Sequence, residues 1–207
     1  MNSISEFLGA IIQILVFMAI PFVYFIIKTK SRKGFFDFIG LKKSTKKANT
    51  LAILASLIFA FPLLLLTFCS EEFKLIMLDA SSITGKFHQM DFGLNSMFLI
   101  LIVAVFKTAF AEEILFRGFL AKRLINWLGY FKGNAIQAIL FGAIHAAIFA
   151  NATQNPLFLS IIFLVPSIGA YVSVYLNEKV GNHSIVPGWV SHGLANFLSY
   201  LIVGFLV

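Results

Sequence analysis

The chain has 207 residues, of which 59% are hydrophobic and only 12% charged, and its mean hydropathy is +0.92. Soluble domains average about a quarter charged residues, so this composition excludes a soluble globular fold. Half of the sixteen Lys and Arg lie between residues 28 and 47, beside two apolar segments, which is typical of membrane topology rather than of nucleic-acid binding. The single cysteine, Cys69, excludes an internal disulfide framework and a cysteine-built zinc site.

The first half of the chain predicts three spanning helices, each of the roughly 20 apolar residues that a bilayer requires. They are expected at residues 7–27, 48–69 and 93–118. The N-terminus lacks a basic region and a small-residue cleavage site, so the first helix is expected to be retained rather than cleaved. The basic 28–47 linker is predicted to be cytoplasmic, and the more acidic 70–91 stretch to lie outside.

The second half predicts three more helices, at residues 134–150, 157–176 and 185–207. An Asn- and Pro-containing turn at 151–156 separates the first two. A short amphipathic stretch at 120–128 is expected to lie at the cytoplasmic interface. We therefore predict an all-α fold: a polytopic bundle of about six spanning helices around a polar intramembrane cavity, in the cell membrane, with both termini outside.

A few ionisable residues fall inside these predicted spans, where each costs about 3 kcal/mol or more and usually has a function. Glu113 and Arg117 are four residues apart on one helix and can form an ion pair, which has a purely structural interpretation as well. Glu112 has no partner on its own helix. An unpaired carboxylate at the edge of an apolar bundle holds a proton more readily than one in water, which favours Glu112 as a general base.

Two further helices each carry a histidine paired with a residue on the same helix face. His145 follows Phe141 by one turn, and Asn196 follows His192 by one turn. Two histidines, an amide and a glutamate can hold a water, a carbonyl and a developing oxyanion, as hydrolysis of an amide without a nucleophilic side chain requires. No Gly-x-Ser-x-Gly elbow occurs, so a serine triad is not predicted. The structural alternative is that these side chains have no catalytic role and only join helices by hydrogen bonds.

Three sequence motifs carry a resemblance to a known family. The runs are Glu112-Glu113-Ile-Leu-Phe-Arg117, Phe141-Gly-Ala-Ile-His145 and His192-Gly-Leu-Ala-Asn196. They resemble the motifs of the CPBP family, the CaaX-protease and bacteriocin-processing intramembrane proteases, also called the Abi family. The likeness covers residues 93–207 well, as a catalytic core, and residues 1–92 only loosely, as a two-helix membrane region with its linker and outer loop.

The resemblance implies an intramembrane endopeptidase acting on a peptide or membrane-protein substrate in the bilayer. Glu112 would activate water with help from His145, while His192 and Asn196 would stabilise the oxyanion. Three other motif residues would support them: Glu113, Arg117 and Phe141. The sequence predicts no nucleic-acid partner.

Metal dependence and two other functions are the alternatives. Zinc can be held by two histidines and two carboxylates, here Glu112, Glu113, His145 and His192. Because no His-Glu-x-x-His pair occurs and Asn196 is a poor zinc ligand, we favour a mechanism without a metal or other cofactor, with a zinc-dependent variant as the alternative. A binding protein giving self-immunity to a bacteriocin is the alternative from another class. A small proton-coupled transporter is disfavoured, since the two halves show no matching broken helices.

Overall fold

The computed structural model describes residues 2–207, and this range contains helices and no strand. Its long helices are α1 (Ser3–Thr29), α3 (Lys46–Cys69), α8 (Tyr130–Phe149), α9 (Pro156–Tyr175) and α10 (Val186–Phe205). A further continuous helix is built from α6 (Leu94–Ile100), η1 (Leu101–Phe110), η2 (Glu113–Ala121) and α7 (Lys122–Leu128). The short elements are α2 (Phe35–Phe38), α4 (Glu71–Leu78), α5 (Ile83–His88) and η3 (Leu176–Val180).

The structure confirms an all-α membrane bundle, and four of its helices are long and apolar enough to cross a bilayer. These four are Ser3–Thr29, Lys46–Cys69, Leu94–Leu128 and Pro156–Val180. Helices α8 and α10 have 20 residues each, but polar residues interrupt them, among them buried Asn134 and Gln137 in α8. That α8 and α10 also span the membrane, which gives the total of six, stays a prediction.

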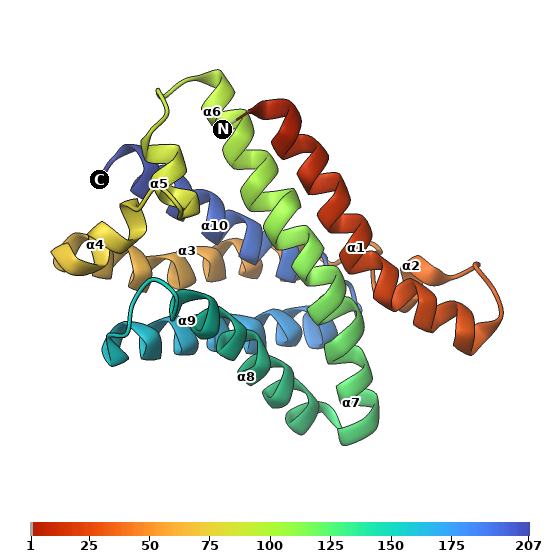
Figure 1. Cartoon of the computed structure of the whole chain (residues 1–207). Helices are drawn as coiled ribbons and strands as arrows, with labels where there is room; N and C mark the ends of the chain where they lie inside the picture. Colours follow the sequence, from red (N-terminus) through yellow and green to blue (C-terminus); the bar gives the residue numbers. More distant parts are fainter. Residues whose placement is uncertain (1) are drawn as a thin grey trace.

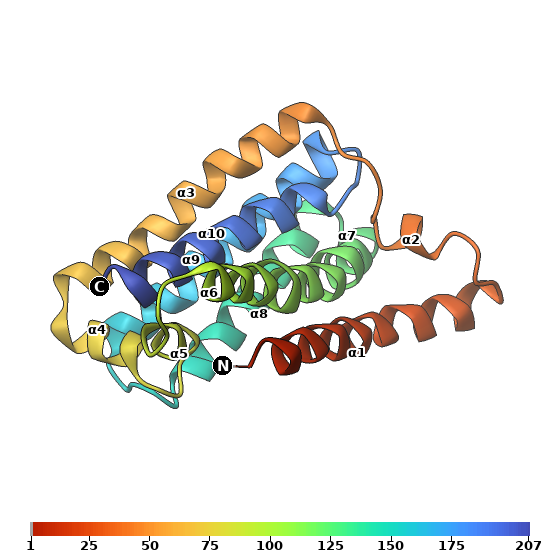
Figure 2. The ribbon, with the colours of Figure 1, turned by 90° about the horizontal axis from the view of Figure 1, so that it is seen from above.

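The two ends of the bundle carry different loops. Both termini lie at the same end as α4, α5 and the turn between α8 and α9, whereas α2 and α7 lie at the other end (Figures 1 and 2). That the helices cross the membrane in the alternating order predicted from the charged residues stays a prediction. Which end faces the cytoplasm stays a prediction.

The third long helix differs from the sequence-based expectation. It does not stop near Gly118 but runs unbroken from Leu94 to Leu128, and Gly129, with a φ of +80°, follows its end. The expected separate interfacial helix at 120–128 is therefore its last part. Gly118 serves close packing instead, because a Cβ there would lie 2.8 Å from the backbone oxygen of Ile39.

Two stretches of this helix, η1 and η2, are π-helical, and Ala111 and Glu112 join them. A π-helix replaces the i to i+4 hydrogen bonds with i to i+5 bonds and is frequent at functional sites. Within η1 the Val105 carbonyl accepts a hydrogen bond from the Trp189 indole of α10, at 2.7 Å. This contact fixes α10 against the helix that carries the two glutamates.

Helices α8 and α9 approach each other closely. Gly142 of α8 lies where an added Cβ would overlap the Ser167 hydroxyl of α9. The amide of Asn134 donates to the Tyr171 carbonyl at 3.1 Å, and that of Gln137 to the Ala170 carbonyl at 3.2 Å. Small residues and interhelical hydrogen bonds are the usual means of joining helices in lipid. Together they hold α8 against α9.

The basic linker between α1 and α3 is docked onto the loop that precedes α10. The backbone N–H of Ile185 donates to the Gly40 carbonyl at 2.9 Å, and the Ser184 hydroxyl donates to the Lys42 carbonyl at 2.6 Å. At the same end of the bundle, Lys122 of α7 pairs with Glu178 of η3 at 2.5 Å. The linker therefore closes this end of the bundle rather than hanging free.

Candidate active site

His192 of α10 lies between the two adjacent glutamates of the π-helical segment. Its Nε2 is 3.8 Å from Oε2 of Glu112, and its Nδ1 is 3.4 Å from Oε1 of Glu113. Glu112, which has no partner on its own helix, therefore faces a histidine from another one. Both distances exceed an ordinary hydrogen bond, so the ring is close to both carboxylates without being tied to either.

Glu113 and Arg117 form the ion pair that their spacing predicts. The Arg117 Nε lies 3.2 Å from Oε1 of Glu113, and the two side chains are 2% and 0% exposed. The contact has the distance of an ion pair but not the angle of a hydrogen bond, so Nε has no acceptor with good geometry among residues 2–207. The guanidinium carbon also lies 3.9 Å from the ring centroid of Phe141, a cation–π contact.

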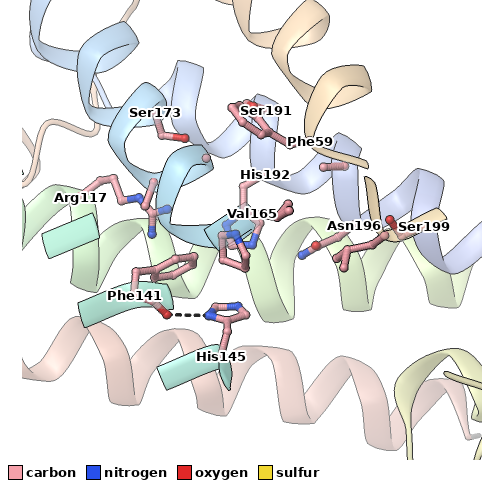
Figure 3. A pocket seen from close by; sticks show the side chains of 15 residues that line it. Phe59, Arg117, Phe141, His145, Val165, Ser173, Ser191, His192, Asn196 and Ser199 are labelled. Atoms are coloured by element: carbon pink, nitrogen blue, oxygen red, sulfur yellow. Dashed lines mark hydrogen bonds between the residues drawn. The ribbon is translucent and has the colours of Figure 1, made fainter. Parts of the chain in front are cut away.

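His145 has a defined tautomer when it is neutral. Its Nδ1 lies 2.9 Å from the backbone oxygen of Phe141 (Figure 3). A carbonyl oxygen can only accept, so Nδ1 carries the proton and the lone pair of Nε2 is left to accept one. The Phe141 ring contacts both histidines, with centroid distances of 4.4 Å to His145 and 5.8 Å to His192. Phe141 thus supports three site residues at once, including Arg117.

A cavity of about 130 Å³ opens among these residues. Its lining includes five residues of the three motifs, namely Arg117, Phe141, His145, His192 and Asn196 (Figure 3). Three serines, which the sequence analysis did not single out, add hydroxyl groups: Ser173, Ser191 and Ser199. The apolar part of the lining includes Phe59 and Leu63 of α3. A water molecule takes about 30 Å³, so the cavity has room for a few water molecules.

Asn196 supplies a free donor at this cavity. Its Nδ2 is buried and has no acceptor within the part of the chain that the structure describes. A buried amide without a partner is costly, which suits a group that waits for a ligand oxygen. The arrangement therefore offers a donor at Asn196 and an acceptor at His145 Nε2.

Glu112 does not line this cavity. It borders a neighbouring one of about 230 Å³, whose walls include Lys107 and Thr108 of η1. Its Oε2 is buried without a hydrogen-bond partner in the described range, and His192 lies between it and the first cavity. The structure thus brings Glu112 to His192, and through His192 to the other motif residues.

Two residues that the sequence analysis missed pack against Glu113. Asn177 of η3 is 1% exposed and accepts a hydrogen bond from the backbone N–H of Gly188 at 2.8 Å. A Cβ on Gly188 would overlap Oε2 of Glu113. From the sequence, Pro187-Gly188 indicates only an irregular first turn of a helix, and Asn177 carries no charge. Neither Gly188 nor Asn177 is therefore identified as a site residue from the sequence alone.

The four residues considered for zinc do not form a metal site in the described chain. Residues 2–207 contain no group of three or more His, Cys, Asp or Glu placed to hold a metal ion. His192 directs its two ring nitrogens at different carboxylates, whereas the carbonyl at His145 Nδ1 leaves the Nε2 of that ring free. Zinc binding by Glu112, Glu113, His145 and His192 stays an alternative prediction.

Comparisons with known proteins agree with the motif resemblance. A family model, described as type II CAAX prenyl endopeptidase Rce1-like, matches residues 94–198, which contain all three motifs. Neither the comparison with curated proteins nor that with solved structures gave a match. The match extends over half of the chain and confirms the resemblance to the CPBP intramembrane proteases. The chain therefore belongs to the type II CAAX prenyl endopeptidase Rce1-like family, a family of membrane-embedded proteases.

Proposed function

We propose that the chain is an intramembrane endopeptidase that hydrolyses a peptide bond of a membrane-associated or peptide substrate with water activated by Glu112. The observation that carries this proposal is the position of His192, whose ring nitrogens lie 3.8 Å and 3.4 Å from two adjacent glutamates. The cavity beside it offers the unpaired amide of Asn196 and the free Nε2 of His145. Donors, an acceptor and a carboxylate base are the groups that amide hydrolysis requires.

In the proposed reaction the water lies beside His192, on the side of the cavity nearest Glu112. Glu112 removes a proton from this water, and His145 Nε2 accepts a hydrogen bond that orients it. The water oxygen forms a bond to the carbonyl carbon, and the carbonyl electron pair moves onto oxygen. Asn196 Nδ2 and His192 donate to this oxyanion. As the oxyanion collapses, the carbon–nitrogen bond breaks and the proton held by Glu112 passes to the leaving amine. One water is consumed for each bond cleaved.

The supporting residues fix this arrangement. Arg117 balances the charge of Glu113 and stacks on Phe141, whose own backbone oxygen orients His145. Buried charges in an apolar bundle need such partners. We place the 28–47 linker in the cytoplasm and both termini outside, in a bacterial-type plasma membrane, which puts cleavage near the cytoplasmic interface. The excess of Lys and Arg in that linker supports this orientation.

The mechanism proposed here uses no metal. The chemistry of the donor set supports this choice, because Asn196 is a good oxyanion donor and a poor zinc ligand. Zinc-dependent cleavage by the same cavity is the competing form of the proposal. The effect of a chelator on cleavage distinguishes the metal-free mechanism from the zinc-dependent one.

The test is cleavage of a library of membrane peptides by purified protein in detergent, with and without a chelator. We expect cleavage by wild type, its loss in Glu112→Gln and His145→Ala, and no effect of the chelator. Glu6→Gln is the matched control, since the Glu6 and Glu112 side chains are 20% and 18% exposed but Glu6 pairs with Lys107. Loss of activity in chelator with recovery on added zinc would overturn the metal-free mechanism. Failure of wild type to cleave any peptide, with Glu112→Gln still functional in cells, would point to a binding protein.

A further inference from the structure

Asn177 and Gly188 approach the Glu113 carboxylate from two different elements, η3 and α10. The backbone N–H of Gly188 donates to Oδ1 of Asn177 at 2.8 Å, and this bond fixes which way the amide of Asn177 is turned. Its other atom, Nδ2, is buried and has no acceptor among residues 2–207. The amide is therefore oriented with its oxygen satisfied and its two N–H donors unused.

The missing side chain of Gly188 shows what faces this amide. A Cβ built on Gly188 would overlap Oε2 of Glu113 and lie 2.9 Å from Nδ2 of Asn177. The donor and the carboxylate oxygen thus border the same small space, which only a glycine leaves free. Oε2 of Glu113 is itself buried with no donor in the described chain. Unpaired buried donors and acceptors are costly. A hydrogen bond from Asn177 Nδ2 to Glu113 Oε2 would satisfy the donor and the acceptor at once.

We infer that Asn177 is a positioning residue: a small shift of the Glu113 carboxylate brings Oε2 within hydrogen-bond distance of Asn177 Nδ2, which then donates to it and holds the carboxylate in place. Glu113 then presents its other oxygen to Nδ1 of His192, at 3.4 Å, and the ring presents Nε2 to Glu112, at 3.8 Å. The orientation of His192 is in this way set from η3, through an uncharged residue that does not line the cavity. The effect on turnover rests on the proposed protease function, whereas the orientation of His192 does not.

Substitutions of Asn177 separate its two possible roles. Asn177→Ala removes the donor, and we expect kcat to fall about 10- to 100-fold, the usual effect of losing a hydrogen bond to a charged group. The KM is expected to stay unchanged, because Asn177 is not among the cavity residues. Asn177→Asp keeps an oxygen that accepts from Gly188 but replaces the N–H donor with a carboxylate oxygen beside Glu113. We therefore expect a fall in kcat at least as large. Wild-type kcat in Asn177→Asp would overturn the inference, because the Gly188 bond alone would then be the role.

A matched control removes the same kind of side chain elsewhere. Asn134 is 0% exposed and also makes an interhelical hydrogen bond, to the Tyr171 carbonyl. We expect Asn134→Ala to lower stability as Asn177→Ala does but to keep wild-type kcat. Gly188→Ala is expected to lower kcat because the added Cβ displaces the Glu113 carboxylate. Helix propensity does not explain this effect, since alanine favours a helix more than glycine does. Equal kcat losses in Asn134→Ala and Asn177→Ala would reduce Asn177 to a general packing role and overturn the inference.

A spectroscopic readout tests the inference without any substrate. The chain has four histidines, so NMR of histidine-labelled protein gives few ring signals, and His192→Gln assigns that of His192. We expect Asn177→Ala and Asn177→Asp to shift the His192 ring signal and to leave that of exposed His183 unchanged. An unmoved His192 signal in both variants would refute the link. If wild type cleaves no peptide but the signal shifts, the proposed function fails and the positioning role stands.

Discussion

The buried pair of Glu113 and Arg117 makes a quantitative prediction about stability. The two side chains are 0% and 2% exposed and lie 3.2 Å apart, so removing either charge leaves the other uncompensated inside the bundle. Breaking a buried pair in this way costs about 3–5 kcal/mol. We expect Glu113→Gln near the lower limit, since the contact lacks hydrogen-bond geometry. Arg117→Met is expected near the upper limit, because it also removes the cation on Phe141, worth about 2 kcal/mol when desolvated.

The assay is unfolding in mixed micelles by titration with a denaturing detergent, read by circular dichroism, for both single variants and the double variant. Because the double variant leaves no unpaired charge, we expect it to be more stable than the sum of the two losses predicts, by about 2–3 kcal/mol. The pair of Lys107 and Glu6, at 2.7 Å and with side chains 30% and 20% exposed, is the control. Its coupling is expected to be at most about 1 kcal/mol. Additive losses for Glu113 and Arg117 would refute the reasoning.

Three further predictions concern other parts of the molecule. Gly142→Ala pushes α8 away from α9 and is expected to lower the free energy of unfolding by about 1–3 kcal/mol in the same assay. Adding Ser167→Ala is expected to restore part of this stability, whereas adding a surface substitution is not. Trp189→Phe removes the hydrogen bond to η1 and is expected to cost about 1 kcal/mol and to speed amide hydrogen exchange in η1; unchanged exchange would contradict this role. The hydroxyl and N–H of Ser81 lower the pKa of Asp79 below its ordinary 3.8, so this loop contact is expected to stabilise above that pH and to be lost as the pH falls through the lowered pKa. NMR titration of Asp79 checks this, and an unchanged pKa in Ser81→Ala would contradict it.

Much of the site could be predicted because its chemistry is conspicuous in an apolar sequence. Glu112 and Glu113 stand out in a segment that is otherwise membrane-like, and the Glu113–Arg117 pair follows from helical spacing alone. The convergence of the three motifs at one histidine also follows once their helices are recognised. What spacing does not reveal is which atoms face each other, and here Glu112 faces His192 rather than the main cavity.

The parts that could not be predicted depend on contacts between distant segments. Gly118 resembles a helix end because glycine commonly follows one, but here it makes room for the backbone at Ile39. The hydrogen bond of η1 to Trp189 joins residues far apart in sequence. Asn177 is neutral and lies at the end of a span, where an amide usually faces water. Only the three-dimensional packing shows that it is buried against Glu113.

The wall that α3 contributes to the cavity bears on how substrates are chosen. Phe59 and Leu63 line the cavity together with the histidines, yet both precede the segment that matches the family. Part of the apolar lining thus comes from outside the segment that carries the three motifs. If the cavity receives substrate as we propose, substitutions of Phe59 or Leu63 are expected to change which substrates are cleaved while leaving the motif residues intact.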